Sequence, residues 1–158
     1  MKVILLGDSC VGKSTLLTCV RKNQNIIPTI GVDCIVYNKM QIWDTSGHPR
    51  FKPVVEAFYS KMDVFVFVYR DMESLGNIEM IRRKVMRLKS STPCKYIIVY
   101  NGDDKDVGIQ GKMYSVMYNF KFLRGDLKKK KVSERVMNTI EKCAEASEKN
   151  RWRYCWFY

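Results

Sequence analysis

Short apolar runs alternate with apolar positions at helical spacing along this chain, which predicts that strands alternate with helices. Residues 3–6 are all apolar, and a helical stripe follows them at residues 16–20. Residues 64–69 and 96–100 are apolar or aromatic throughout, as is typical of strands that are covered on both faces. We therefore expect these last two strands at the centre of a parallel sheet.

Two strands that are neighbours in the sequence are predicted to pair as an antiparallel hairpin. Residues 33–37 and 40–43 are rich in residues that favour strands, and only Asn38 and Lys39 separate them. A two-residue connection between such runs is typical of a hairpin turn. The sheet is therefore expected to be mostly parallel, with one antiparallel hairpin strand.

Two longer helices are predicted in the second half of the chain. Apolar side chains between residues 78 and 88 recur at spacings of three, four and three, with arginines and lysines on the opposite face. Residues 132–143 repeat this helical period, and a short strand is expected before them at residues 120–123. Residues 107–119 have no such regular pattern and are expected to form a loop with one irregular helix.

This order of strands and helices predicts an α/β fold with ligands bound beyond the carboxyl ends of its strands. The 158 residues contain no linker-like segment and no internal repeat, so a single domain is expected, at residues 1–150. A short basic and aromatic tail is expected at residues 151–158. The pattern predicts neither a membrane span nor a signal peptide, which favours a cytoplasmic protein.

The net charge of +12 favours contact with an anionic surface but does not identify that surface. Basic residues are concentrated at 82–89, 128–131 and 149–153. A solvated face is the simpler interpretation, and contact with an anionic membrane or with nucleic acid is the alternative. No specific nucleic-acid partner is predicted. The six cysteines have no C-x-x-C spacing and His48 is the single histidine, which argues against a structural zinc site.

Directly after the first strand, residues 7–14 (Gly-Asp-Ser-Cys-Val-Gly-Lys-Ser) match the pattern G-x-x-x-x-G-K-[ST]. Such a loop aims successive backbone N–H groups at one concavity, where they bind phosphate. Lys13 is expected to reach the terminal phosphates, and the Ser14 hydroxyl is expected to bind Mg²⁺. The predicted fold is therefore a doubly wound sheet of the P-loop NTPase type. The expected nucleotide-binding residues of the loop are Gly7, Ser9, Cys10, Val11, Gly12, Lys13, Ser14 and Thr15.

Two further segments narrow the class of phosphate-binding protein. Asp44 lies at the end of a predicted strand, where it can hold Mg²⁺ through a water molecule. Gly47 can offer its backbone N–H to a γ-phosphate, and the Thr29 hydroxyl can close over the same magnesium ion. Because a contact with the γ-phosphate is lost on hydrolysis, the loop that follows Gly47 is predicted to be a switch.

These segments resemble those of the Ras superfamily of small GTPases, and most closely those of the Rab family. The resemblance covers nearly the whole chain and includes the phosphate loop, T-I-G-V-D at 29–33 and Q-I-W-D-T-x-G at 41–47. It implies that Ser14 and Thr29 are Mg²⁺ ligands, and that Thr29 and Gly47 sense the γ-phosphate. It further implies that Asp44 holds the ion through water. GDP and GTP are the implied ligands, and effector and regulatory proteins are the implied partners.

The residue expected to be catalytic departs from the family pattern. Where the family has a glutamine that orients the attacking water, this chain has His48. A neutral imidazole can hold a water through one nitrogen, so His48 is the candidate catalytic residue. The alternative is a substitution that only slows hydrolysis. Pro49 occupies a position where Rab proteins usually have glutamate, and its restricted φ is expected to stiffen the second switch.

The segments expected to bind the base differ from the family pattern even more. The family motif N-K-x-D appears at residues 101–104 as Asn-Gly-Asp-Asp, which makes Asn101 and Asp104 the expected base-binding residues. Gly102 lacks the lysine stem that packs along the base in the family. The family's S-A-K motif is not found near residues 123–125, and residues 21–28 contain no aromatic residue to cover the base. Binding is therefore expected to depend on the phosphates and to be weaker than in a typical Rab.

Three functions are considered: a slowly hydrolysing GTPase switch, a guanine-nucleotide-binding scaffold with little hydrolysis, and an ATP-using kinase. Asp104 favours guanine and so disfavours the kinase. At the C-terminus, Cys155 stands fourth from the end, but the residues after it do not fit a C-a-a-X prenylation signal. The tail is expected to fold back onto the domain, with a membrane interface as the alternative. Membrane trafficking is the role that the Rab resemblance suggests.

Overall fold

The structure, a computed structural model, describes residues 1–21, 28–89 and 94–154, with side chains as far as residue 147. Six strands form one sheet in the order β2-β3-β1-β4-β5-β6. β2 and β3 are antiparallel, and every other neighbouring pair is parallel. The strands are β1 (Lys2–Leu6), β2 (Val32–Tyr37), β3 (Met40–Thr45), β4 (Val64–Tyr69), β5 (Lys95–Tyr100) and β6 (Lys121–Arg124). The predicted mostly parallel sheet with one antiparallel hairpin strand is confirmed.

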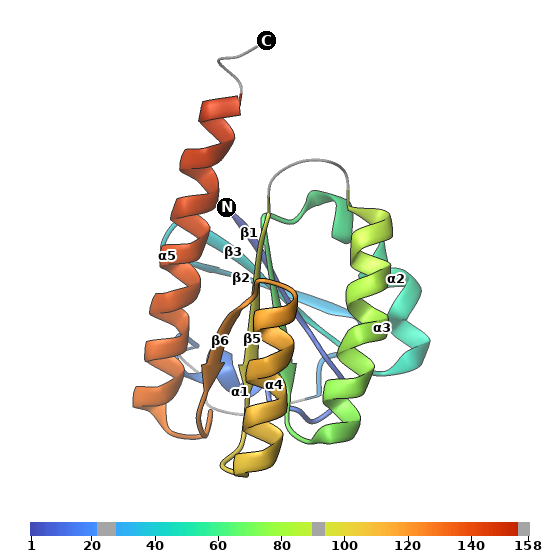
Figure 1. Cartoon of the computed structure of the whole chain (residues 1–158). Helices are drawn as coiled ribbons and strands as arrows, with labels where there is room; N and C mark the ends of the chain where they lie inside the picture. Colours follow the sequence, from blue (N-terminus) through green and yellow to red (C-terminus); the bar gives the residue numbers. More distant parts are fainter. Residues whose placement is uncertain (22–27, 90–93, 155–158) are drawn as a thin grey trace.

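Helices cover both faces of this sheet (Figure 1). Helices α1 and α5 pack on one face, and α2, α3 and α4 pack on the other. The helices are α1 (Lys13–Leu16), α2 (Lys52–Glu56), α3 (Met72–Leu88), α4 (Lys105–Met117) and α5 (Lys130–Tyr154). Three 3-10 turns, η1 (Leu17–Cys19), η2 (Pro49–Phe51) and η3 (Tyr59–Lys61), lie between these elements.

The central strand β4 separates two apolar cores. Its three valines lie in the core beneath α5, together with Val136 and Ile140. Its two phenylalanines and Tyr69 lie in the core beneath α3. All six residues of β4 are fully buried, which explains why its sequence is apolar throughout and does not alternate.

Helix α3 begins where its sequence supplies a capping box. The Asp71 carboxylate accepts a hydrogen bond from the Ser74 backbone N–H at 2.8 Å, and the Ser74 hydroxyl accepts one from the Asp71 N–H at 3.0 Å. Ile78 and Val85 of the predicted stripe are fully buried, whereas Leu88 in the last turn is 42% exposed. The predicted crossover helix is therefore confirmed, with its last apolar residue outside the core.

Helix α4 replaces the loop with one irregular helix expected at residues 107–119, and that expectation was wrong. The buried face of this regular 13-residue helix consists of Gly108, Gly111 and Ser115. Tyr69 of β4 lies against it, and a Cβ added at Gly111 would lie 1.6 Å from the Tyr69 hydroxyl. The buried positions of α4 thus carry small residues instead of large apolar ones. The sequence therefore shows no apolar stripe at helical spacing here.

The last described element is the long helix α5, which continues past residue 150 to Tyr154. Residues 22–27 of the expected first switch and residues 155–158, with Cys155, lie outside the described residues. Within the ranges that the structure describes, no helix is both long and apolar enough to cross a bilayer.

Candidate functional site

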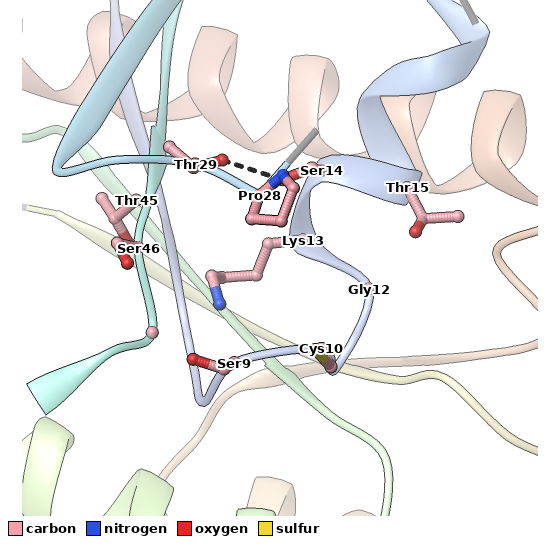
Figure 2. A pocket seen from close by; sticks show the side chains of 11 residues that line it. Ser9, Cys10, Gly12, Lys13, Ser14, Thr15, Pro28, Thr29, Thr45 and Ser46 are labelled. Atoms are coloured by element: carbon pink, nitrogen blue, oxygen red, sulfur yellow. Dashed lines mark hydrogen bonds between the residues drawn. The ribbon is translucent and has the colours of Figure 1, made fainter. Parts of the chain in front are cut away.

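The loop between β1 and α1 borders a cavity of about 200 Å³ beyond the carboxyl end of β1 (Figure 2). Three segments far apart in the sequence form its wall: the loop with α1, the residues before β2, and the end of β3 with the residues after it. The lining residues are Ser9, Cys10, Gly12, Lys13, Ser14, Thr15, Pro28, Thr29, Thr45, Ser46 and Gly47. Most of the predicted phosphate and metal residues are thus brought together at one hollow.

Two glycines allow the loop to follow this tight path. Gly7 has φ +144° and Gly12 has φ +107°, conformations that residues with a side chain rarely adopt. A Cβ at Gly7 would lie 2.1 Å from the carbonyl oxygen of Val68, and one at Gly12 would lie 2.3 Å from the Asn101 amide nitrogen. The loop backbone therefore packs directly against the β4 backbone at Gly7 and against the Asn101 side chain at Gly12.

Lys13 is a buried cation beside the cavity. Its side chain is 5% exposed, and its Nζ donates to the carbonyl oxygens of Gly7 at 3.0 Å and Asp8 at 2.5 Å. Figure 2 shows this side chain between the loop at Ser9 and the segment at Thr45 and Ser46. Burial lowers the pKa of Lys13 from its usual 10.5 to about 8, although the nearby Asp44 and Asp8 carboxylates act in the opposite direction. The ammonium group is therefore held where a polyphosphate could replace the carbonyl oxygens as its partner.

Ser14, Thr29 and Asp44 converge on one point beside this cation. The Ser14 hydroxyl donates to Asp44 Oδ2 at 2.6 Å, and the Thr29 hydroxyl donates to the same oxygen at 3.0 Å. The two hydroxyl oxygens are 3.1 Å apart, as the dashed line in Figure 2 marks. The residues come from α1, from the segment before β2 and from β3, so only the folded chain joins them.

These oxygens fit a magnesium ion. Asp44 is fully buried, and its second carboxylate oxygen, Oδ1, has no hydrogen-bond partner among the described residues. A buried carboxylate oxygen without a partner costs free energy unless a cation or water satisfies it. Two hydroxyls and a carboxylate are hard oxygen donors of the kind that Mg²⁺ prefers. The donor set therefore suits the ion that the sequence predicts.

The segment after β3 lies against the phosphate loop at Gly47. A Cβ at Gly47 would lie 2.2 Å from the Asp8 carbonyl carbon and 2.2 Å from the Ser9 nitrogen, so no side chain fits there. His48 follows, but it is exposed and is not among the residues that line the cavity. Its Nδ1 accepts a hydrogen bond from the Arg50 N–H at 3.3 Å, so a neutral ring carries its proton on Nε2.

Neither of the predicted base-binding residues is among those that line this cavity. The Asn101 amide donates to the Val11 carbonyl at 2.8 Å and its oxygen accepts from the Leu127 N–H at 3.0 Å, so this side chain ties the phosphate loop to the loop before α5. Asp104 is exposed, and its Oδ1 accepts from the Val107 N–H at 3.0 Å as the N-cap of α4. One oxygen of the expected guanine-reading carboxylate is thus engaged by the helix.

Gly102 occupies the place of the family's lysine for a steric reason. A Cβ there would lie 2.6 Å from the hydroxyl of Tyr100, whose buried ring stacks on Tyr69 at 5.0 Å. The sequence interpretation recognised the missing lysine but not the tyrosine that requires the glycine.

Sequence reasoning also missed two side chains around the site. Arg21 Nη2 lies 3.7 Å from Asp44 Oδ2, and the Asn77 amide of α3 donates to the Asp8 carboxylate at 2.8 Å. No local pattern predicts either contact, because the fold alone brings these partners together. The N-cap role of Asp104 did have a signal, since aspartate favours the position before the first turn of a helix.

The comparison with known proteins agrees with this geometry. The chain matches the family model described as Ras family over residues 2–148. It is 34% identical over 115 residues to the Ras-related protein RABD1 of Arabidopsis thaliana, which covers 65% of this chain and 56% of that protein. It is 30% identical over 169 residues to the Ras-related protein RabC of Dictyostelium discoideum, which covers 94% of this chain and 86% of that protein.

A third relative is the GTP-binding protein YPT1 of Saccharomyces cerevisiae, with 33% identity over 118 residues, or 66% of this chain and 57% of that protein. The matches to RABD1 and YPT1 thus span little more than half the length of those proteins. The family match, in contrast, extends across nearly the whole described sheet and its helices. The chain therefore belongs to the Ras family of small GTPases and is Rab-like.

Proposed function

We propose that this chain binds GDP and GTP with Mg²⁺ and hydrolyses GTP slowly, as a switch between two nucleotide states. The observation that carries the proposal is the convergence of Ser14, Thr29 and Asp44 beside the buried Lys13. This arrangement offers one ammonium group and three hard oxygen donors to a polyphosphate and its divalent ion. Phosphate binding is therefore the best-supported part of the proposal.

Different residues of the site would bind the phosphates and the metal ion. Backbone N–H groups of the phosphate loop and the Lys13 ammonium bind and orient the phosphates. Ser14 and Thr29 would hold Mg²⁺ directly, and Asp44 would hold it through water, in place of their present hydrogen bonds. The bound ion would neutralise negative charge on the phosphate oxygens.

One backbone hydrogen bond can couple nucleotide state to the surface of the protein. The Ser46 N–H donates to the Gly31 carbonyl at 2.8 Å, which links the segments that carry Gly47 and Thr29. If Gly47 and Thr29 both contact the γ-phosphate, loss of this phosphate releases both segments together. Ile30 and Val36, in and next to these segments, are 80% and 75% exposed, which supports effector or regulatory proteins as partners of this region.

The first experiment identifies the nucleotide that copurifies with the protein and then measures single-turnover hydrolysis with and without Mg²⁺. Guanine nucleotide and a magnesium-dependent rate at or below about 10⁻³ s⁻¹ are expected. Adenine nucleotide would instead support the kinase. Absence of binding to GDP and GTP in a folded sample would overturn the proposal.

His48→Ala is expected to slow single-turnover hydrolysis about tenfold and to leave GTP affinity unchanged. The ring is exposed and its Nδ1 is occupied by the Arg50 N–H, so it acts through an Nε2–H that can hold the attacking water by donating to it. His48→Gln, which restores the glutamine of the family, is the matched control and should hydrolyse at least as fast as the natural protein. An unchanged rate in the alanine variant would limit His48 to capping η2.

Asp104→Asn is expected to shift nucleotide preference from guanine to xanthine. The amide donates where the carboxylate accepts, and asparagine caps a helix as well as aspartate does, so α4 is kept. Competition binding with GDP and xanthosine diphosphate measures the change. Asp103→Asn is the control on the neighbouring residue, and equal guanine preference in all three proteins would mean that another group reads the base.

A scaffold with little hydrolysis is the second candidate function. The exposed His48, which is turned toward the Arg50 N–H and does not line the cavity, favours it. The measured rate separates this candidate from the switch. A role in membrane trafficking, a cytoplasmic location and peripheral contact of the basic surface with anionic membrane are further proposals, which rest on the Rab-like sequence and the charge of +12.

A further inference from the structure

Two carboxylates face each other where β2 and β3 pair. The antiparallel register places Asp33 directly opposite Asp44. Like charges in directly opposed positions destabilise a strand pair, and Asp44 is fully buried, which raises the cost of its charge. This part of the candidate magnesium site therefore needs a positive charge even when no metal is bound.

Arg21 supplies that charge from the residue after the turn that follows α1. Its Nη2 is 2.6 Å from Asp33 Oδ2 and 3.7 Å from Asp44 Oδ2. Its backbone is fixed as well, because the Arg21 N–H donates to the Leu17 carbonyl at 3.0 Å. The Nε of Arg21 is buried without a hydrogen-bond partner in the described part of the chain. The Arg21 side chain is 27% exposed, and its guanidinium lies beside both carboxylates.

Arg21 and Mg²⁺ would act on the same carboxylate. Asp44 Oδ2 accepts from Ser14 and Thr29, the two hydroxyls that would ligate the ion, and the same oxygen lies 3.7 Å from Arg21 Nη2. A fixed positive charge this close repels a divalent cation and reduces the negative charge available to it. Lys13 is also attracted to Asp44, but its ammonium would be engaged by the phosphates in the loaded protein.

We propose that Arg21 is a positioning residue that neutralises Asp44 in the metal-free protein and weakens Mg²⁺ binding in the nucleotide-bound protein. The inference rests on the proposed function and deepens it. Loss of Mg²⁺ then destabilises this protein less than it would destabilise a protein without Arg21, because the arginine still neutralises Asp44. Nucleotide release depends correspondingly less on magnesium.

The test measures release of a fluorescent GDP analogue from the full chain over a range of Mg²⁺ concentrations. Arg21→Gln is expected to lower the Mg²⁺ concentration that half-maximally slows release by about tenfold. Arg21→Lys, which keeps the charge, is expected to stay within about threefold of the natural protein. Arg83→Gln removes an equal charge from the exposed surface of α3 and should leave this concentration unchanged.

Asp33→Asn is a second variant, and it is expected to change the required Mg²⁺ concentration in the opposite direction. It frees the guanidinium from its closest partner, so Arg21 pairs fully with Asp44 and the Mg²⁺ concentration required rises. An unchanged or higher Mg²⁺ requirement in Arg21→Gln would overturn the inference. If that variant does not fold, an unchanged requirement in Asp33→Asn overturns it.

Thermal denaturation without metal or nucleotide provides a readout that needs no loaded protein. Arg21→Gln is expected to melt at a lower temperature than Arg83→Gln, because the buried Asp44 loses its nearest guanidinium. If the natural protein binds no nucleotide, the proposed function fails, and this comparison still decides the role of Arg21. Equal melting temperatures would then reject it.

Discussion

Lys13→Met is expected to lower the affinity for GDP and GTP by at least about a hundredfold and to stabilise the nucleotide-free protein. The loss of affinity follows because the ammonium is the one cationic side chain among the residues that line the described cavity. Charge-assisted hydrogen bonds to phosphate contribute about 1.5 to 3 kcal/mol each, and about 2.7 kcal/mol corresponds to a hundredfold.

The gain in stability has a separate cause. Lys13 is 5% exposed, and its pKa is lowered to about 8 because burial disfavours the charged form. At pH 7 the side chain is still protonated, so its buried charge lowers the stability of the nucleotide-free protein. Methionine at this position would carry no charge. Methionine has a similar length and no charge, and a gain of about 1 to 3 kcal/mol in the free energy of unfolding is expected.

Calorimetric titration with GDP and urea unfolding of the nucleotide-free protein measure the two effects. Lys84→Met is the matched control, because Lys84 is 43% exposed in α3 and pairs with Glu56 at 3.1 Å. This control should change neither nucleotide affinity nor stability by more than about 0.5 kcal/mol. If Lys13→Met binds GDP within tenfold of the natural affinity, Lys13 does not bind the phosphates.

The phosphate loop could be located from the sequence because its geometry is local. Residues 7–14 form the loop within one stretch of backbone, and their glycines are required by positive φ and by the close approach of Val68 and Asn101. Ser14, Thr29 and Asp44 were expected to share one Mg²⁺ ion, first from their motif positions and then from the family resemblance. In the structure their side-chain oxygens lie within hydrogen-bonding distance of one another, although they come from three separate segments. Continuous apolar runs predicted the buried strands because burial on both faces leaves no polar positions.

What the sequence did not predict depends on tertiary contacts. Arg21 meets Asp44 only because β2 pairs with β3 beside α1, and no spacing along the chain indicates this contact. Asp104 fits the family's base-reading motif, and the structure shows that its side chain caps α4, a contact that the motif does not indicate. Only an irregular helix within a loop was expected where the regular helix α4 lies, because its buried face is made of glycine and serine.

Gly111→Ala is expected to destabilise the protein by about 2 kcal/mol, although alanine is the better helix former. Its Cβ would lie 1.6 Å from the Tyr69 hydroxyl and 2.5 Å from the ring carbon that carries it. The ring has no room to withdraw, because Tyr69 is fully buried and stacks on Tyr100 at 5.0 Å. The strain of overpacking therefore outweighs the gain of about 1 kcal/mol in helix propensity.

Gly76→Ala is the matched control, since Gly76 lies within α3 and a Cβ there meets nothing within 4 Å. Helix propensity acts alone at this position, so the control should stabilise the protein by up to about 1 kcal/mol. Urea unfolding of both variants gives the comparison, and the opposite signs test the close packing of α4 on β4 directly. If both alanines stabilise the protein equally, α4 does not lie against Tyr69. Tyr69→Leu should reduce the cost of Gly111→Ala, because it removes the atoms with which the new Cβ collides.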